Sequence, residues 1–71
     1  MKELSIGQMI EALQSNQIAK STNKNIRSNV VRNELGYYWT FQNSTHLWRQ
    51  FTIDNDVVNS KWIIEDINKK D

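Results

Sequence analysis

The sequence predicts an α+β fold, in which one amino-terminal amphipathic helix packs on a small antiparallel sheet of about four to five strands, with a short helical turn before the last strand. Two patterns predict this arrangement. Apolar residues near the amino terminus recur at helical spacing, whereas those of the middle and the end alternate with polar residues, as in half-buried strands. The 71 residues contain no proline and no repeat or linker, so we expect a single small domain over residues 1–71.

The helix is predicted over residues 6–15. Ser5 and Gln8 have the spacing of a capping box, in which each side chain accepts a hydrogen bond from the backbone N–H of the other residue. Four apolar residues then share one face of the helix, which we expect to pack on the sheet: Ile6, Met9, Ile10 and Leu13. Asn16 is expected to end the helix, because asparagine tolerates the left-handed conformation.

The next segment predicts two strands joined by a polar loop. Ile18 and Ala19 begin a short first strand. Residues 20–25, KSTNKN, are too polar to be buried and therefore predict a loop or a ragged strand edge. Residues 26–31 alternate with the period of a half-buried strand, and residues 32–34 are expected to turn the chain.

Residues 35–51 hold every aromatic residue of the chain except Trp62. They predict a hairpin with arms at residues 35–41 and 46–51, joined by the polar loop 42–45. Alternate residues of the first arm are predicted to build the core, namely Leu35, Tyr37, Trp39 and Phe41. The opposite face of the hairpin is expected to expose Tyr38 and Trp48.

The carboxy-terminal part predicts a helical turn and a closing strand. Asp54 and Asp56 come before a pair of valines, as expected for a helical turn with an acidic start within residues 52–60. Residues 62–64 predict the last strand, and the charged tail from residue 65 to residue 71 is expected to fray.

Composition limits the kinds of partner and of stabilisation. The formal net charge is +1, with basic and acidic residues interspersed, which disfavours nucleic acid as a partner. With no cysteine and one histidine, neither a disulfide nor a usual metal site can support a core that buries only roughly 60% of the unfolded surface at this length. We therefore expect a homo-oligomer. No apolar run reaches the roughly 20 residues that span a bilayer and no signal peptide is evident, so we expect no membrane partner and a cytoplasmic location.

No group of residues predicts catalysis. Asp54 and Asp56 form one acidic pair and Glu65 and Asp66 another, but nothing brings a nucleophile or a second base to either pair. The first pair is better explained as helix caps, and His46 stands alone beside a loop. We therefore expect no enzymatic activity, no metal and no cofactor.

The hairpin offers groups for binding instead. Four of its residues carry a stacking surface or a cation, namely Tyr38, His46, Trp48 and Arg49. Such groups hold a base, a nucleotide or a protein hot spot. The alternative is that Trp39, Phe41, Phe51 and Trp62 are core and the remaining residues are ordinary surface. A small nucleic-acid-binding domain would use the same groups, but this chain lacks the basic excess.

Two segments resemble the phage Thoeris anti-defence sponge domain of the second type. Residues 5–16, SIGQMIEALQSN, are similar to its opening, where a Phe-Gly start leads an amphipathic helix that ends at a glycine. In this chain isoleucine replaces the phenylalanine and Asn16 replaces the final glycine. Residues 56–64, DVVNSKWII, are similar to its closing pattern of an aspartate, two aliphatic residues, a polar step, a tryptophan and a final strand.

The middle of the chain follows the family less closely. Trp48 is the candidate match for an upstream tryptophan of the family. The family's turn, which contains Trp-Asn-Gly after an arginine, falls on residues 20–25, where only Asn25 matches. The resemblance implies a small phage or prophage protein that forms a homo-oligomer and sequesters a host nucleotide immune signal without cleaving it. Such a signal is a cyclic ADP-ribose isomer or a cyclic oligonucleotide.

A site for such a ligand needs aromatic faces for the base and cations for the phosphates. Chosen from this sequence rather than transferred from the family, the candidate ligand-binding residues are Tyr38, Trp48, Arg49, Lys24 and Arg27. The alternative function is that of a small phage-encoded protein that inhibits a host defence or replication protein by direct protein–protein binding through the aromatic hairpin.

Overall fold

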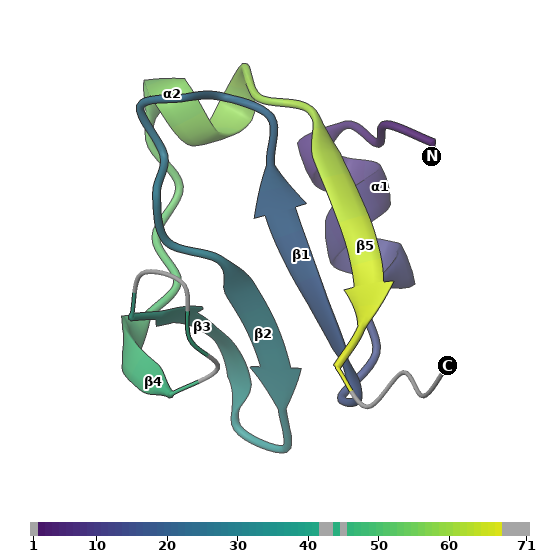
Figure 1. Ribbon diagram of the computed structural model, residues 1–71, viewed down its shortest axis with the longest axis vertical. Helices are drawn as coiled ribbons and strands as arrows, with labels where there is room; N and C mark the ends of the chain where they lie inside the picture. Colours follow the sequence, from purple (N-terminus) through teal and green to yellow (C-terminus); the bar gives the residue numbers. More distant parts are fainter. Residues whose placement is uncertain (1, 42–43, 45, 68–71) are drawn as a thin grey trace.

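An antiparallel sheet with one helix across one of its faces forms the body of the protein (Figure 1). The computed structural model describes residues 2–41, 44 and 46–67. Within them the elements are α1 (Ile6–Ala12), β1 (Gln17–Ser21), β2 (Val30–Asn33), β3 (Gly36–Thr40), β4 (Leu47–Gln50), α2 (Asn55–Val58) and β5 (Trp62–Asp66). The five strands have the order β4-β3-β2-β1-β5, and all neighbours are antiparallel. The predicted α+β fold is confirmed.

Helix α1 begins as the sequence predicts. Ser5 Oγ accepts a hydrogen bond from the Gln8 N–H at 3.3 Å, and Gln8 Oε1 accepts one from the Ser5 N–H at 3.0 Å, so the capping box is formed. The predicted apolar face packs on the core. Met9 and Leu13 are fully buried, and the remaining two residues of that face are partly buried against them.

The helix ends earlier than predicted. Its last residue is Ala12, because Leu13 adopts an extended conformation while its side chain enters the core. A tight turn then leads into β1. This turn is closed by a hydrogen bond from the Gln17 N–H to the Gln14 carbonyl at 3.1 Å. The expectation that the helix runs to residue 15 and is ended by Asn16 is therefore wrong.

Strand β2 lies further along the chain than predicted. Alternation predicted a strand over residues 26–31, but β2 spans Val30–Asn33 and residues 26–29 belong to the connection from β1. Ile26 packs against the core from this connection, which explains its apolar character without a strand. Asn29 is held to the sheet through Thr40, whose backbone N–H donates to the Asn29 carbonyl at 2.8 Å.

The turn between β2 and β3 falls at residues 34–35 instead of the predicted 32–34. Asn33 lies opposite Gly36 in the ladder, and Asn33 Oδ1 accepts the Leu35 N–H at 2.8 Å. Gly36 has a φ of 133°, a conformation that residues with a side chain rarely adopt. Glycine at this position therefore allows the tight reversal.

The predicted core of the first hairpin arm is correct only at its centre. Trp39 is buried, with its ring 4.9 Å from that of Phe51, and Tyr37 is half-buried. Leu35 is 81% exposed and Phe41 is 52% exposed, so their assignment to the core is wrong. The reason is that Leu35 lies in the turn before β3 and Phe41 lies beyond its end. Residues 42, 43 and 45 of the predicted hairpin loop are outside the described residues.

The predicted helical turn with an acidic start is confirmed as α2. Asp54 is its N-cap, and Asp54 Oδ1 accepts the Val57 N–H at 3.0 Å while Val57 itself is buried. The closing strand is longer than predicted, because Glu65 and Asp66 pair with β1 in β5. The prediction that the tail frays from residue 65 is therefore wrong for Glu65 and Asp66. Residues 68–71 are outside the described residues.

The two faces of the sheet differ. In Figure 1 helix α1 lies behind β5. The core on this side contains seven buried residues, namely Met9, Leu13, Ala19, Val30, Trp39, Val57 and Trp62. The Tyr37 hydroxyl donates to the Ile10 carbonyl at 2.6 Å and fastens the helix to β3. Neither helix of the described chain has the length and hydropathy to cross a membrane.

The opposite face of the sheet, which we call the helix-free face, carries its own apolar residues. Cross-strand neighbours point to the same side of a sheet, so Ile18, Val31 and Tyr38, which lie opposite one another on β1, β2 and β3, share a face. Ile18 and Val31 are buried although neither belongs to the helix-side core.

Candidate functional site

A hollow of about 170 Å³ lies between the β1–β2 connection, strand β4 and helix α2. Arg27 enters it from the connection, and Trp48 and Arg49 enter it from β4. Asp54 and Asp56 line it from α2 and its N-cap. We call this site the arginine–tryptophan hollow. Trp39 and Val57, which are buried residues of the helix-side core, also line it.

A local irregularity in β4 brings Trp48 and Arg49 together. Neighbouring residues of a regular strand point to opposite faces. Here the register shifts, so that Arg49 lies opposite Trp39 and Leu47 lies opposite Thr40, which leaves Trp48 as the extra residue of a bulge. The Arg49 guanidinium carbon lies 4.5 Å from the centroid of the Trp48 ring, a cation–π contact.

Trp48 also packs against the end of β3. Its ring centroid is 6.2 Å from that of Phe41, with an angle of 28° between the ring planes. Trp48 nevertheless remains 50% exposed. It is therefore held in place by an aromatic contact and a cation while part of its indole ring stays open to a ligand.

The charges of the hollow are balanced. Arg27 and Arg49 face Asp54 and Asp56, and among these four described residues no ion pair forms within 4.0 Å. The Asp54 carboxylate is engaged at the start of α2, where it caps the Val57 N–H. Because two formal charges of each sign are present, net charge does not draw a bare phosphate into the hollow. Stacking and paired hydrogen bonds would have to decide what binds.

Three of the five residues predicted to bind a ligand meet in this hollow, namely Arg27, Trp48 and Arg49. Tyr38 lies elsewhere, because it shares the helix-free face with Val31. Lys24 is exposed in the β1–β2 connection, next to Asn25, which does line the hollow.

Sequence reasoning missed the two aspartates as site residues. It explained Asp54 and Asp56 as helix caps, which is correct for Asp54. Their place beside Arg27 depends on the β1–β2 connection reaching α2, and no local pattern predicts that long-range contact. Among residues 2–41, 44 and 46–67 no group of three or more histidine or acidic side chains is arranged to hold a metal ion.

Three large apolar residues at the ends of β3 and β4 are exposed near the hollow. Phe41, Leu47 and Trp48 are 52%, 48% and 50% exposed, respectively. Leu47 and Trp48 are adjacent in β4, and Phe41 stacks on Trp48. Large apolar side chains that gather on the surface often mark an interaction surface. We call these three residues the hairpin patch; of them, only Trp48 also lines the hollow.

The fold and the site together define an α+β protein with one helix on a five-stranded sheet and an arginine–tryptophan hollow beside its edge strand. Comparison of the chain with protein-family models, with curated proteins and with solved structures gave no match.

Proposed function

We propose that this protein is a non-enzymatic phage or prophage anti-defence protein that binds and sequesters a host nucleotide immune signal, either a cyclic ADP-ribose isomer or a cyclic oligonucleotide. The observation that carries the proposal is the convergence of Arg27, Trp48 and Arg49 on one hollow. The resemblance of residues 5–16 and 56–64 to the sponge domain supports the same class of function.

In the proposed complex a base stacks on the open part of the Trp48 ring. Every nucleobase has a π-face, and stacking on an aromatic side chain contributes about 1–3 kcal/mol per base. Arg27 and Arg49 donate hydrogen bonds to phosphate oxygens. Asp56 accepts hydrogen bonds from ribose hydroxyls or from the amino group of the base. A nucleotide offers all of these groups. A bare phosphate offers only its charge, which the carboxylates of Asp54 and Asp56 would repel.

The volume of the hollow limits which part of the ligand enters it. At about 170 Å³ it is smaller than the roughly 300–1,000 Å³ of sites that enclose a whole small molecule. We propose that it takes one base or ribose of the ligand, and that a homo-oligomer in the cytoplasm of the host cell covers the remainder.

Calorimetric titration tests this function. Cyclic ADP-ribose isomers and cyclic dinucleotides are titrated into the full chain, whose oligomeric state is measured by light scattering. Saturable binding with the ligand recovered unchanged supports sequestration. Arg27→Ala and Lys61→Ala remove the same charge, and Lys61 is exposed and outside the hollow lining. Only Arg27→Ala should weaken binding. A monomer that binds none of these ligands contradicts the proposal.

The hairpin patch favours a second candidate function, the inhibition of a host defence or replication protein by direct contact. Half-exposed aromatic residues beside an arginine are typical of the centre of a protein–protein interface. Leu47→Ser separates the two candidates, because Leu47 lies in the hairpin patch but does not line the hollow. Loss of anti-defence activity in infected cells with unchanged nucleotide affinity would favour protein binding.

A further inference from the structure

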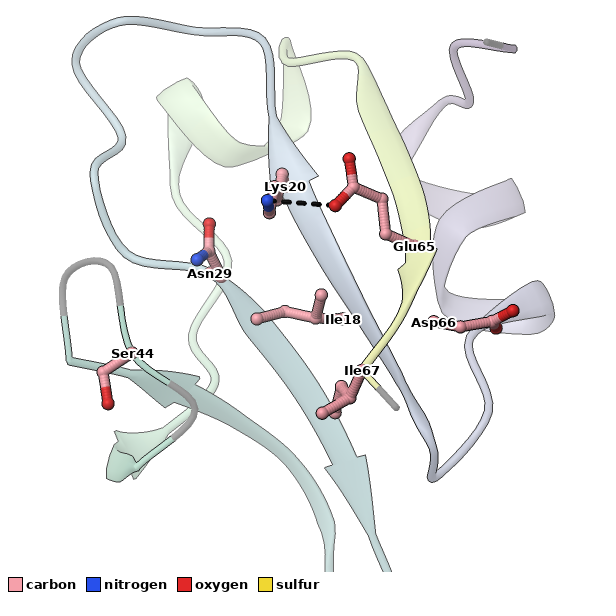
Figure 2. A pocket seen from close by; sticks show the side chains of 7 residues that line it. All are labelled: Ile18, Lys20, Asn29, Ser44, Glu65, Asp66 and Ile67. Carbon is pink, nitrogen blue, oxygen red and sulfur yellow. Dashed lines mark ion pairs between the residues drawn. The ribbon is translucent and has the colours of Figure 1, made fainter. Parts of the chain in front are cut away.

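A second and larger hollow lies on the helix-free face of the sheet (Figure 2). It has a volume of about 650 Å³ and is lined by residues of β1 and β5, with Asn29 and Ser44 at one side and Ile67 at the end of β5. This volume lies within the roughly 300–1,000 Å³ of small-molecule sites. We call it the sheet hollow, and it shares no lining residue with the arginine–tryptophan hollow.

Two isoleucines, Ile18 and Ile67, are the apolar part of the lining of the sheet hollow. Ile18 is only 7% exposed, although α1 packs on the opposite face and Ile18 is not part of the helix-side core. Figure 2 shows Ile18 between Lys20 and Ile67, with Glu65 beside Lys20. Two isoleucines in this position suit an aliphatic or aromatic group that gains by leaving water.

An ion pair lies beside these isoleucines. Lys20 Nζ is 3.0 Å from Glu65 Oε1, and the two side chains are 48% and 38% exposed. An ammonium group has three donors and a carboxylate has about four acceptor positions, so each head can bind a further group. Asp66 points away from the other labelled residues in Figure 2, and its Oδ1 accepts a hydrogen bond from Gln17 Nε2 at 3.1 Å.

The ion pair selects the charge of a ligand. A purely anionic ligand would be attracted by Lys20 and repelled by Glu65, and a purely cationic one would experience the reverse. A ligand with one charge of each sign satisfies both heads at once. The ordinary molecule with adjacent carboxylate and ammonium groups and an apolar body is a free amino acid.

We propose that the sheet hollow binds a free amino acid with an aliphatic or aromatic side chain. Its carboxylate binds Lys20, its ammonium group binds Glu65, and its side chain lies on Ile18 and Ile67. The Asn29 amide lies beside the hollow as a further hydrogen-bonding group. This site is independent of the proposed nucleotide function, because the two hollows lie on different parts of the molecule.

Nuclear magnetic resonance titration of the isotope-labelled full chain tests the proposal. L-leucine and L-phenylalanine are the probes, and we expect saturable shifts of the backbone amides of Ile18, Lys20 and Glu65. N-acetyl-L-leucine lacks the ammonium group and L-leucinamide lacks the carboxylate. Each should bind about tenfold or more weakly, because one charge-assisted hydrogen bond is lost.

Single substitutions complete the test. Lys20→Met and Glu65→Gln should each weaken binding of the better probe by about tenfold or more. Lys61→Met removes an exposed lysine outside the hollow and should leave the affinity unchanged. Circular dichroism and thermal unfolding establish that each variant is folded. The proposal is overturned if neither probe gives saturable shifts, if the shifts map outside the sheet hollow, or if folded Lys20→Met binds as the unaltered chain does.

Discussion

Two substitutions, Trp48→Ala and Trp39→Ala, test whether the aromatic residues of the hairpin divide into core and binding surface. Trp48 is 50% exposed and makes two defined aromatic contacts, with the Phe41 ring and the Arg49 guanidinium. An aromatic pair contributes about 0.5–1.5 kcal/mol and an exposed cation–π contact about 0.5–1 kcal/mol. We therefore expect Trp48→Ala to lower the free energy of unfolding by about 1–2 kcal/mol.

The cost at Trp39 should be larger. Trp39 is 6% exposed and packs against Phe51 and Trp62, with ring centroids at 4.9 Å and 6.5 Å. Truncating a buried tryptophan to alanine costs about 3–5 kcal/mol. A chain of 71 residues has a total stability of only about 4–11 kcal/mol. Trp39→Ala should therefore be largely unfolded or close to it, whereas Trp48→Ala remains folded.

Urea denaturation followed by far-ultraviolet circular dichroism measures both costs. With a slope of about 1 kcal/mol per molar urea, Trp48→Ala should lower the midpoint by about 1–2 M. Equal losses of stability for the two variants would refute the division, because Trp48 would then be a core residue whose ring is not free to meet a ligand.

Three further substitutions probe the fold. Gly36→Ala should lower the free energy of unfolding by more than about 1 kcal/mol, because φ is 133° there, and unchanged or higher stability in thermal unfolding would count against this conformation. Tyr37→Phe removes the 2.6 Å hydrogen bond to the Ile10 carbonyl and should cost about 1 kcal/mol, seen as a melting temperature lower by about 4–8 °C; no change would mean that this bond does not hold α1. Leu35→Ser should change stability by no more than about 0.5 kcal/mol, since Leu35 is 81% exposed, and a large loss in the same assay would place it in a core.

Features that depend on neighbouring residues could be predicted from the sequence. The capping box at Ser5 and Gln8 and the cap at Asp54 each join residues three apart, and both are formed in the structure. The alternation around Trp39 likewise predicted a buried residue in a strand. In these cases the local pattern and the tertiary packing favour the same structure.

Strand limits were harder to predict, because tertiary contacts decide them. Ile26 packs on the core from the β1–β2 connection. Its alternation with Arg27 therefore has the pattern of a half-buried strand, although residue 26 lies outside β2. Leu35 and Phe41 continue the alternation of β3, but Leu35 lies in the turn before β3 and Phe41 lies beyond its end, so both are exposed. A period of two gives the face of a residue only where the strand is regular.

Only part of the candidate site could be predicted, because tertiary contacts also decide which side chains meet there. Trp48 and Arg49 are adjacent in sequence. In a regular strand their side chains would point to opposite faces, but the bulge brings the two side chains together. The prediction of Arg27 rests on its charge alone. Its place in the same hollow follows from the path of the long β1–β2 connection toward α2, which is not encoded in any short motif.

The most direct measurement of the central claim is the affinity of one cyclic nucleotide for Trp48→Ala and for Leu47→Ala, compared with the unaltered chain. The two residues are adjacent and equally half-exposed, at 50% and 48%, but only Trp48 lines the arginine–tryptophan hollow. If a base stacks on Trp48, its loss should weaken binding roughly tenfold or more, whereas Leu47→Ala should bind as the unaltered chain does. Equal affinities for both folded variants, or no binding of any cyclic nucleotide by the unaltered chain, would contradict the account.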